Sequence, residues 1–316
     1  MSAPGAPPEP GPGPDPEPAS SAPRHTIDRL ADHARVSETP GRPNAAARAL
    51  LRWLGPLVRL LFRPRMAGWE HLPEGPFLLV ANHSGGGVAE ILCLAHLWDE
   101  HFGEERPLAG MSAPAVYVFP GLGFLLRSVG AIPSTYRHAE AAFASGAAVL
   151  LFPGGDHDAF RPLWKANEVD WNGRQGYLRL ARAAGVPIVP LGFRGSHYTN
   201  PILWRSTLLP HLTVLPRLVF GVKRYPITLW SVLGAALLLG LAGPAWGYPL
   251  AAALTAAWLI SPFVFVIPCL PWTVRGRLGP ALPHAELFPP GEEGLVLSAA
   301  NERVLAAVQS LVLARD

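Results

Sequence analysis

The chain has 316 residues, of which 49% are hydrophobic and only 16% are charged, and its formal net charge is +3. The charged fraction lies below the roughly 25% that is usual in soluble globular proteins. Such a small net charge, with no basic run interleaved with aromatic residues, excludes nucleic acid as an expected partner. A slight arginine excess on an apolar chain instead favours contact with an anionic membrane surface.

The first 43 residues are rich in proline. Residues 1–23 read MSAPGAPPEPGPGPDPEPASSAP and lack the apolar core of a signal peptide. Because proline opposes both helix and sheet, we expect residues 1–43 to form an extended, disordered tail.

An amphipathic helix is expected over residues 44–66, with Asn44 as its N-cap and a kink at Pro56. Its arginines are spaced by four, seven and four residues: Arg48, Arg52, Arg59 and Arg63. On a helical wheel they fall within about 60° of one another, and most other positions are apolar. A narrow arginine stripe of this kind is typical of a helix at the membrane interface. A core helix with one solvated face is the alternative.

Short apolar runs alternate with helical patterns through residues 67–225. Strands are expected at 77–82, at the end of 141–155 and at 186–193, and helices at 89–102, at the start of 141–155 and at 176–185. The apolar runs 115–119 and 130–134 flank another short helical unit. This alternation predicts an α/β fold with a mostly parallel central sheet flanked by helices.

Residues 226–271 form a second, very apolar region. No formally charged residue lies between Arg224 and Arg275, a distance long enough for two spans of ~20 residues. We expect a helical hairpin that spans or re-enters the bilayer, with a buried soluble hairpin as the alternative. Basic residues flank both ends, which places both on the cytoplasmic side. Residues 272–316 are expected to add a strand and an amphipathic helix to the core.

His83 stands where the expected strand 77–82 ends, the position at which ligands gather in open α/β sheets. The glycines that follow allow close backbone approach, and the amides of Gly85 and Gly86 are candidates to bind an oxyanion. Glu90 begins the next helix and can reach back to orient the imidazole. A histidine held by a carboxylate can act as a general base. The alternative is an ordinary loop histidine before a helix with an acidic first turn.

Three further blocks follow in the chain. They are Gly121, Phe124 and Arg127 at three-residue spacing; Phe152, Pro153, Gly154, Gly155 and Asp156 in succession; and the apolar segment 186–190, which contains two prolines. With Asn82-His83 in front, these four blocks resemble the glycerolipid acyltransferase superfamily, which includes lysophosphatidate acyltransferases. The resemblance covers about residues 67–224, and residues 271–282 look like the downstream strand of that family.

The resemblance implies a transfer reaction. His83 would remove the proton from an acceptor hydroxyl while Glu90 holds its ring, and the oxygen would attack the thioester of acyl-CoA or acyl carrier protein. Arg127 would bind a phosphate, Phe124 would pack, and Gly121 with the third block would contact substrate. The donor is a substrate, so no bound cofactor is expected. No HExxH or other ligand cluster appears, so no metal is expected either. Cys93 and Cys269 lie far apart in apolar segments and are expected to be buried thiols.

Two departures from the family pattern matter. Most members carry the acid five residues after the histidine, where this chain has Val88, so Glu90 takes the role if the glycines loop out. Asp156 and Asp158 are possible substitutes. The third block has Gly154 where many members have glutamate, which resembles members that acylate neutral glycerides. The acceptor therefore stays open between lysophosphatidate, another lysophospholipid and a neutral acylglycerol.

Two other functions are compatible with parts of the sequence. The stretch HSGGG is similar to the HGGG oxyanion motif of lipases, but no GxSxG elbow follows it in the chain. A catalytically inactive, lipid-binding membrane scaffold would explain the displaced acid. We predict a membrane-associated O-acyltransferase at the cytoplasmic face of the cell membrane. Its oligomeric state and acyl-chain preference are not predicted.

Overall fold

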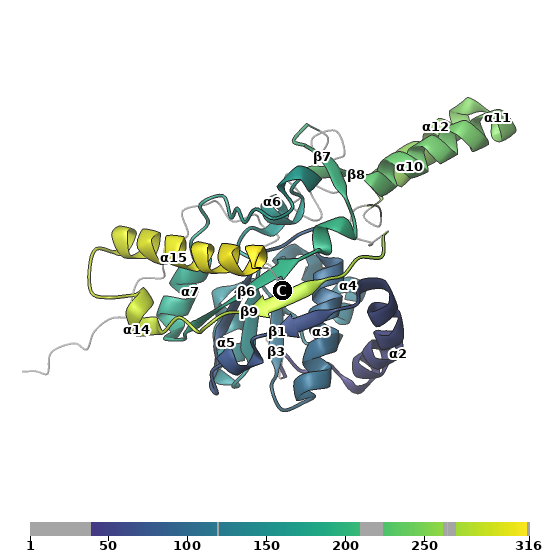
Figure 1. Ribbon diagram of the computed structural model, residues 1–316. Coiled ribbons are helices and arrows are strands. Elements are labelled where there is room, and N and C mark those ends of the chain that lie inside the picture. Colours follow the sequence, from purple (N-terminus) through teal and green to yellow (C-terminus); the bar gives the residue numbers. More distant parts are fainter. Residues whose placement is uncertain (1–38, 119, 209–223, 262–263, 265–269, 315–316) are drawn as a thin grey trace, which may run out of the picture.

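The computed structural model describes residues 39–314 except 119, 209–223, 262–263 and 265–269. Most of the expected tail and Cys269 lie outside the described residues. A seven-stranded sheet forms the centre, in the order β1 (Arg65–Ala67), β9 (Arg275–Leu278), β6 (Ile188–Arg194), β2 (Leu78–Ala81), β5 (Ala148–Leu151), β3 (Leu108–Ser112) and β4 (Ile132–Pro133) (Figure 1). Strands β6 to β4 are parallel, whereas β9 runs antiparallel to β6 and parallel to β1.

Helices cover both faces of this sheet. Helices α2 (Ala45–Phe62) and α3 (Val88–Phe102) pack on one face, and α5 (Tyr136–Ala144), α7 (Gly176–Ala184) and α15 (Glu293–Leu313) pack on the other. All four residues of β2 are buried, with Leu78 and Val80 in one core and Leu79 and Ala81 in the other. A strand that is apolar on both faces is what a parallel sheet between two helical layers requires. The predicted α/β fold is confirmed.

Shorter elements connect these layers. They are η1 (Trp69–His71), η2 (Pro114–Val118), α4 (Pro120–Ser128), α6 (Gly155–Ala159), η3 (Leu163–Lys165), η4 (Ser196–Tyr198) and α14 (His284–Leu287). The described part of the apolar run 115–119 belongs to η2 rather than to a strand. The neighbouring strand is β3, whose sequence Leu-Ala-Gly-Met-Ser has weak intrinsic preference for a strand.

Helix α2 begins as expected, because the Asn44 side chain accepts a hydrogen bond from the Ala47 N–H at 2.8 Å. The folded chain starts earlier, however. Gly41 donates to the Gly130 carbonyl and accepts from the Leu108 N–H, so residues 39–43 pack beside β3 rather than extending the tail. Gly41 has φ +76°, a conformation that glycine adopts without strain.

The arginine stripe of α2 faces carboxylates. Arg52 pairs with Asp99 at 3.2 Å and Arg59 with Glu100 at 2.6 Å, both acids lying on α3. The outward face of α2 is apolar instead, with Trp53 77% exposed and Leu60 72% exposed. The charged side of this helix therefore joins it to the body, and the side available to a membrane is hydrophobic.

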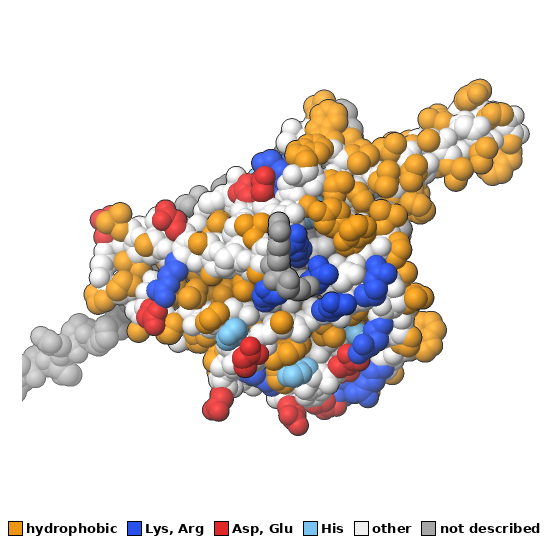
Figure 2. Space-filling view, viewed as in Figure 1, with side chains coloured by type: hydrophobic (Ala, Val, Ile, Leu, Met, Phe, Trp, Pro, Cys, Tyr) orange, Lys and Arg blue, Asp and Glu red, His pale blue; other side chains and the backbone are white. Residues whose placement is uncertain are grey.

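The apolar region forms a hairpin that projects from the body (Figure 1). A small antiparallel sheet, β7 (Ile202–Ser206) with β8 (Tyr225–Thr228), leads into α10 (Leu229–Leu237), the π-helical η5 (Leu238–Ala242), α11 (Gly243–Trp246) and α12 (Tyr248–Ile260). The two arms meet closely, since a Cβ at Gly234 would lie 2.2 Å from the Trp258 ring nitrogen. Apolar side chains cover the arms (Figure 2).

Two helical stretches are long and apolar enough to cross a membrane by length and composition, Leu229–Trp246 and α15. Helix α15 packs on β6 and buries Val304 and Val308, so it belongs to the core. Leu229–Trp246 is largely exposed and, at 1.5 Å per residue, about 27 Å long, close to the ~30 Å hydrocarbon thickness. Whether this hairpin spans or re-enters the bilayer stays a prediction.

Candidate active site

Asn82 fixes the point at which the chain leaves the sheet. Its side-chain amide donates to the Phe193 carbonyl at 2.9 Å, and its side-chain oxygen accepts from the Phe193 N–H at 2.7 Å. The side chain is fully buried. These two bonds prolong the pairing of β2 with β6 by one residue, which sets the direction in which His83 departs.

His83 and Glu90 are in direct contact. The Nδ1 atom of His83 hydrogen-bonds to Oε1 of Glu90, whose side chain is fully buried at the start of α3. Ser84 donates its N–H to Oε1 at 3.0 Å and its hydroxyl to Oε2 at 2.8 Å. Both carboxylate oxygens therefore have partners, which holds Glu90 in one orientation beneath the imidazole.

The three glycines form the loop that allows this contact. Gly85, Gly86 and Gly87 all have positive φ, at +56°, +78° and +83°. A Cβ on Gly87 would lie 2.0 Å from Cε1 of His83, so the ring rests on bare backbone. The two extra residues between histidine and acid are taken up here. Glu90 thus reaches the ring although it is seven positions away.

The oxyanion candidates differ in availability. The Gly86 N–H donates to the Ala159 carbonyl at 3.2 Å, so that amide is already engaged. Within the described ranges, the Gly85 N–H has no acceptor. Of the two candidates, Gly85 therefore has the amide without a described partner, and Gly85 itself is buried.

Phe152 covers the other side of the His83 ring. The two rings are stacked, with centroids 4.2 Å apart and planes inclined by 21°. The His83 side chain is 17% exposed. Since Nδ1 is bound to Glu90, Nε2 is the nitrogen that remains for an incoming hydroxyl.

The third block has no room for the family's glutamate. A Cβ on Gly154 would lie 2.2 Å from Cβ of Asp158 and 3.0 Å from the Trp171 ring. Asp158 is fully buried, accepts from the His83 N–H at 2.5 Å and pairs with the buried Arg161. Asp158 thus supports the backbone of His83 and not its ring. Burial lowers the pKa of Arg161 to about 10.

Arginines surround Asp156 in the same block. Its carboxylate accepts from Arg174 at 3.1 Å and from Arg224 at 3.3 Å, and Arg174 also donates to the Gly154 carbonyl at 2.8 Å. Arg205 donates to the His157 carbonyl at 3.0 Å. Burial, and then the neighbouring charge of Arg224, lower the pKa of Arg205. These arginines come from distant segments of the chain, so no local sequence pattern identifies them.

Behind this region, η4 links β6 to the site. The Ser196 hydroxyl contacts the Ser84 hydroxyl, and Nε2 of His197 bonds to the Arg161 carbonyl at 3.1 Å. Burial and then the charge of Arg161 lower the pKa of His197 to about 4. His197 is therefore neutral at neutral pH and acts as a hydrogen-bond donor within the fold.

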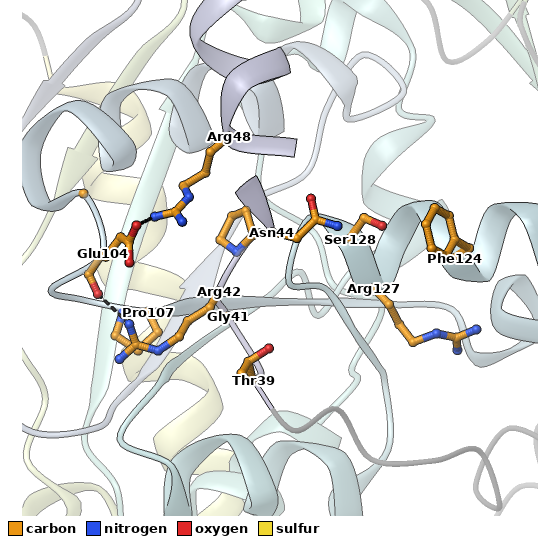
Figure 3. Close-up of a pocket in the computed structure, with 12 residues that line it drawn as sticks. Thr39, Gly41, Arg42, Asn44, Arg48, Glu104, Pro107, Phe124, Arg127 and Ser128 are labelled. Carbon is orange, nitrogen blue, oxygen red and sulfur yellow. Dashed lines mark hydrogen bonds and ion pairs between the residues drawn. The ribbon is translucent and has the colours of Figure 1, made fainter. Parts of the chain in front are cut away.

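The second block lies apart from these residues. The Arg127 guanidinium lies over the Tyr117 ring, 5.8 Å from its centroid, and Phe124, expected to pack, is 69% exposed. Both line a pocket of about 380 Å³ with Arg48 and Glu104, which form an ion pair (Figure 3). This pocket includes no residue of the His83 loop or of the third block. The structure does not bring Gly121, Phe124 and Arg127 into contact with His83.

Two other expectations concern metal and thiols. In the part of the chain that the structure describes, no group of three histidine, cysteine or acidic side chains is placed to hold a metal ion. Cys93 is buried in the core of α3, where burial raises the pKa of its thiol to about 12. A thiol with so high a pKa is unreactive at neutral pH.

Comparison with known proteins gives three findings. The family model described as Acyltransferase matches residues 63–194. An uncharacterized protein of Mycobacterium tuberculosis is 29% identical over 186 residues, which are 58% of this chain and 49% of that protein. An uncharacterized protein of Mycobacterium leprae is 29% identical over 208 residues, 66% of this chain and 52% of that protein. The chain thus spans about half the length of the curated relatives it matches.

Among solved structures, the chain is similar to the 1-acyl-sn-glycerophosphate (LPA) acyltransferase PlsC from Thermotoga maritima. The TM-score is 0.46 at 16% identity, over 92% of this chain and 88% of that one. The family match itself takes in all four blocks, including His83, Glu90 and the third block. It agrees with the resemblance drawn from the sequence, since residues 63–194 match the acyltransferase family model.

Proposed function

We propose that this protein is a membrane-associated O-acyltransferase that moves a fatty acyl group from acyl-CoA or acyl carrier protein to a glycerolipid hydroxyl. The observation that carries the proposal is the His83–Glu90 pair, which lies within the acyltransferase domain and leaves Nε2 of His83 for substrate. The bound Nδ1 sets the tautomer, so that the neutral ring presents an acceptor lone pair at Nε2.

In the proposed reaction, Nε2 of His83 takes the proton of the acceptor hydroxyl as its oxygen attacks the thioester carbonyl carbon. Glu90 stabilises the imidazolium that forms, a general-base contribution of roughly 10²–10⁴ in rate. The Gly85 amide is the candidate donor to the tetrahedral oxyanion. Collapse breaks the C–S bond, the thiolate leaves, and the imidazolium returns its proton to the sulfur.

A phosphorylated acceptor is the better-supported class. Arg174 and Arg224 converge on Asp156, which lies four residues after Phe152, the ring that stacks on His83. Arginine guanidinium groups are well suited to phosphate because they offer paired donors. A neutral acylglycerol remains the second candidate because Gly154 replaces the family's glutamate. We give the arginines more weight than that substitution. Asp158 fills the space that a side chain at position 154 would need, so the missing glutamate has a packing reason that does not depend on the acceptor.

Two exposed apolar surfaces support membrane association. One is the outward face of α2 with Trp53 and Leu60, and the other is the hairpin with Leu241 and Trp246 (Figure 2). Large exposed apolar surfaces mark membrane or protein contacts. We place both surfaces at the cytoplasmic face of the cell membrane, because basic residues flank the hairpin.

The test is acyl transfer by detergent-purified protein. Labelled long-chain acyl-CoA or acyl carrier protein is offered with lysophosphatidate, other lysophospholipids, monoacylglycerol or diacylglycerol, and His83→Ala serves as control. Transfer to a lysophospholipid that disappears in the variant would support the proposal. Transfer only to neutral glycerides would identify a neutral acylglycerol as the acceptor. No transfer to any acceptor would favour the catalytically inactive scaffold.

A further inference from the structure

Four arginines lie on one face of the sheet at its β1–β9–β6 end. Arg65 of β1 stands opposite Arg275 of β9, and Arg275 stands opposite Arg194 of β6. Arg277 follows two positions after Arg275. Side chains two positions apart on a strand share a face, and paired residues share it too. All four arginines therefore project to the same side, and Figure 2 shows basic side chains gathered over β9 and β1.

These arginines line a concave site. A pocket of about 260 Å³ is lined by all four, by Gly192 and by the end of α15 at Leu311 and Ala314. Gly192 pairs with Arg277, and a Cβ there would lie 2.6 Å from Cβ of Leu311. The face is thus closed on one side by α15, whose C-terminal end carries the negative pole of the helix dipole.

The four arginines bring like charges close together on one face of the sheet, and a bound anion would reduce their mutual repulsion. Like charges directly opposite one another on neighbouring strands destabilise a sheet. Within the described residues, neither Arg65 nor Arg194 has a carboxylate at ion-pair distance. Arginines concentrated in a concave site match a ligand with several phosphate charges.

The patch lies at the same edge of the sheet as His83. Arg194 ends β6 and Asn82 follows the end of β2, and these strands are parallel neighbours. Two residues after Arg194, the Ser196 hydroxyl contacts the Ser84 hydroxyl beside His83. Arg275 is the first residue of the antiparallel β9 and so lies at this edge as well. A ligand anchored at the arginines can therefore extend toward the base.

We propose that Arg65, Arg194, Arg275 and Arg277 bind the phosphates of coenzyme A, the carrier of the acyl donor. The proposal rests on the proposed function and makes it more specific, since it selects acyl-CoA over acyl carrier protein. Coenzyme A carries a 3′-phosphate and a pyrophosphate at one end and the thioester on a long flexible arm at the other. The patch holds the charged end, and the arm brings the thioester to His83.

The test is coenzyme A binding to the detergent-purified full chain, measured by calorimetry. Arg65→Gln and Arg194→Gln should each weaken binding about tenfold, the loss of one charge-assisted contact. Arg303→Gln is the matched control, because it removes an exposed arginine on α15 that pairs with Glu286 outside the pocket. The wild type should bind coenzyme A more tightly than 3′-dephospho-coenzyme A, and the variants should lose that preference.

Several results would overturn the proposal. One is equal coenzyme A binding by the wild type and all variants. Another is a lowered melting temperature of the arginine variants with unchanged coenzyme A binding, which would mean that the arginines only stabilise the end of α15. Unchanged coenzyme A binding with weaker sedimentation on phosphatidylglycerol vesicles, and not on phosphatidylcholine vesicles, would assign the patch to lipid headgroups.

Failure of this proposal is distinguishable from failure of the proposed function. Binding needs no turnover, so His83→Ala should bind coenzyme A as the wild type does. A protein that binds coenzyme A through the arginines but transfers nothing would refute the proposed function alone. An active protein that accepts only acyl carrier protein would refute the coenzyme A site alone.

Discussion

Nδ1 of His83 hydrogen-bonds to Oε1 of Glu90 across a loop of three glycines that all have positive φ. The loop lets an acid seven residues downstream reach the imidazole, although most family members have it five residues downstream. The arrangement fixes one ring nitrogen and leaves the other for substrate.

Replacing Glu90 should slow the chemical step without unfolding the protein. In Glu90→Gln the amide oxygen can still accept from Ser84, but the charge that stabilises the His83 imidazolium is gone. We expect kcat to fall by about 10²-fold or more, with a smaller change in KM. Steady-state kinetics measure this. Glu100→Gln, an exposed acid on the same helix, is the control, and equal losses in the two variants would contradict the assigned role.

Gly87→Ala should disrupt the site. Alanine at φ +83° is strained by about 1–2 kcal/mol, and its Cβ would overlap Cε1 of His83. We expect a lower free energy of unfolding and a loss of activity larger than the stability change explains. Gly294→Ala is the matched control, because it lies in α15 with open space around it and should be neutral or slightly stabilising. Normal activity in Gly87→Ala would show that the ring does not rest on Gly87.

Asp158→Asn should destabilise the fold strongly. The amide oxygen can still accept from the His83 N–H, but the buried Arg161 loses its counter-charge. Breaking a buried pair in this way costs about 3–5 kcal/mol, measured by denaturant unfolding. The double variant Asp158→Asn, Arg161→Met removes both charges and should recover much of that loss. If the double variant were less stable than Asp158→Asn, the two charges would not be coupled.

The arginines around Asp156 should govern acceptor binding. Arg174→Gln and Arg224→Gln are each expected to raise KM for a lysophospholipid about tenfold and to leave KM for acyl-CoA nearly unchanged. Arg182→Gln, on the exposed side of α7, is the control. A rise in KM for acyl-CoA alone would show that these arginines bind the donor and not the acceptor.

Acid should weaken the fold through His197. Its pKa is about 4 in the folded protein, below the ordinary 6.5, so the unfolded chain binds more protons between these values. Stability from the neutral, buried ring is thus complete above pH 6.5 and is lost as the pH falls toward 4, by about 3 kcal/mol in total. Unfolding measured across pH 4–7 should show a shallower decline for His197→Gln than for the wild type. Parallel curves would mean that His197 does not titrate there.

The layers of the fold were predictable because their signals are local. Residues of β2 are apolar on both faces, and Gly185 ends α7 with φ +66°. Strand β3 was not predictable, since Ala109 and Gly110 have little strand preference and the strand exists through its pairing with β5 and β4. The described part of the apolar run 115–119 lies in η2, and its composition gave no sign of this, because apolar composition alone does not distinguish a buried strand from a turn of helix.

The candidate site divides in the same way. His83 and Glu90 were predictable because one short loop joins them. Arg174 and Arg224 were not, because they lie 18 and 68 residues after Asp156, and only the fold brings them together. Arg127 is the reverse case. A sequence motif singled it out, but the structure places it over Tyr117 in the pocket that Arg48 and Glu104 line, away from His83.

The most direct test of the account is the rate of acyl transfer from labelled acyl-CoA to lysophosphatidate by the purified protein, compared between wild type and His83→Ala. We expect transfer by the wild type and a loss of at least about 10²-fold in the variant, with unchanged folding by circular dichroism. Undiminished transfer in His83→Ala would show that the base lies elsewhere and would contradict the role proposed for His83.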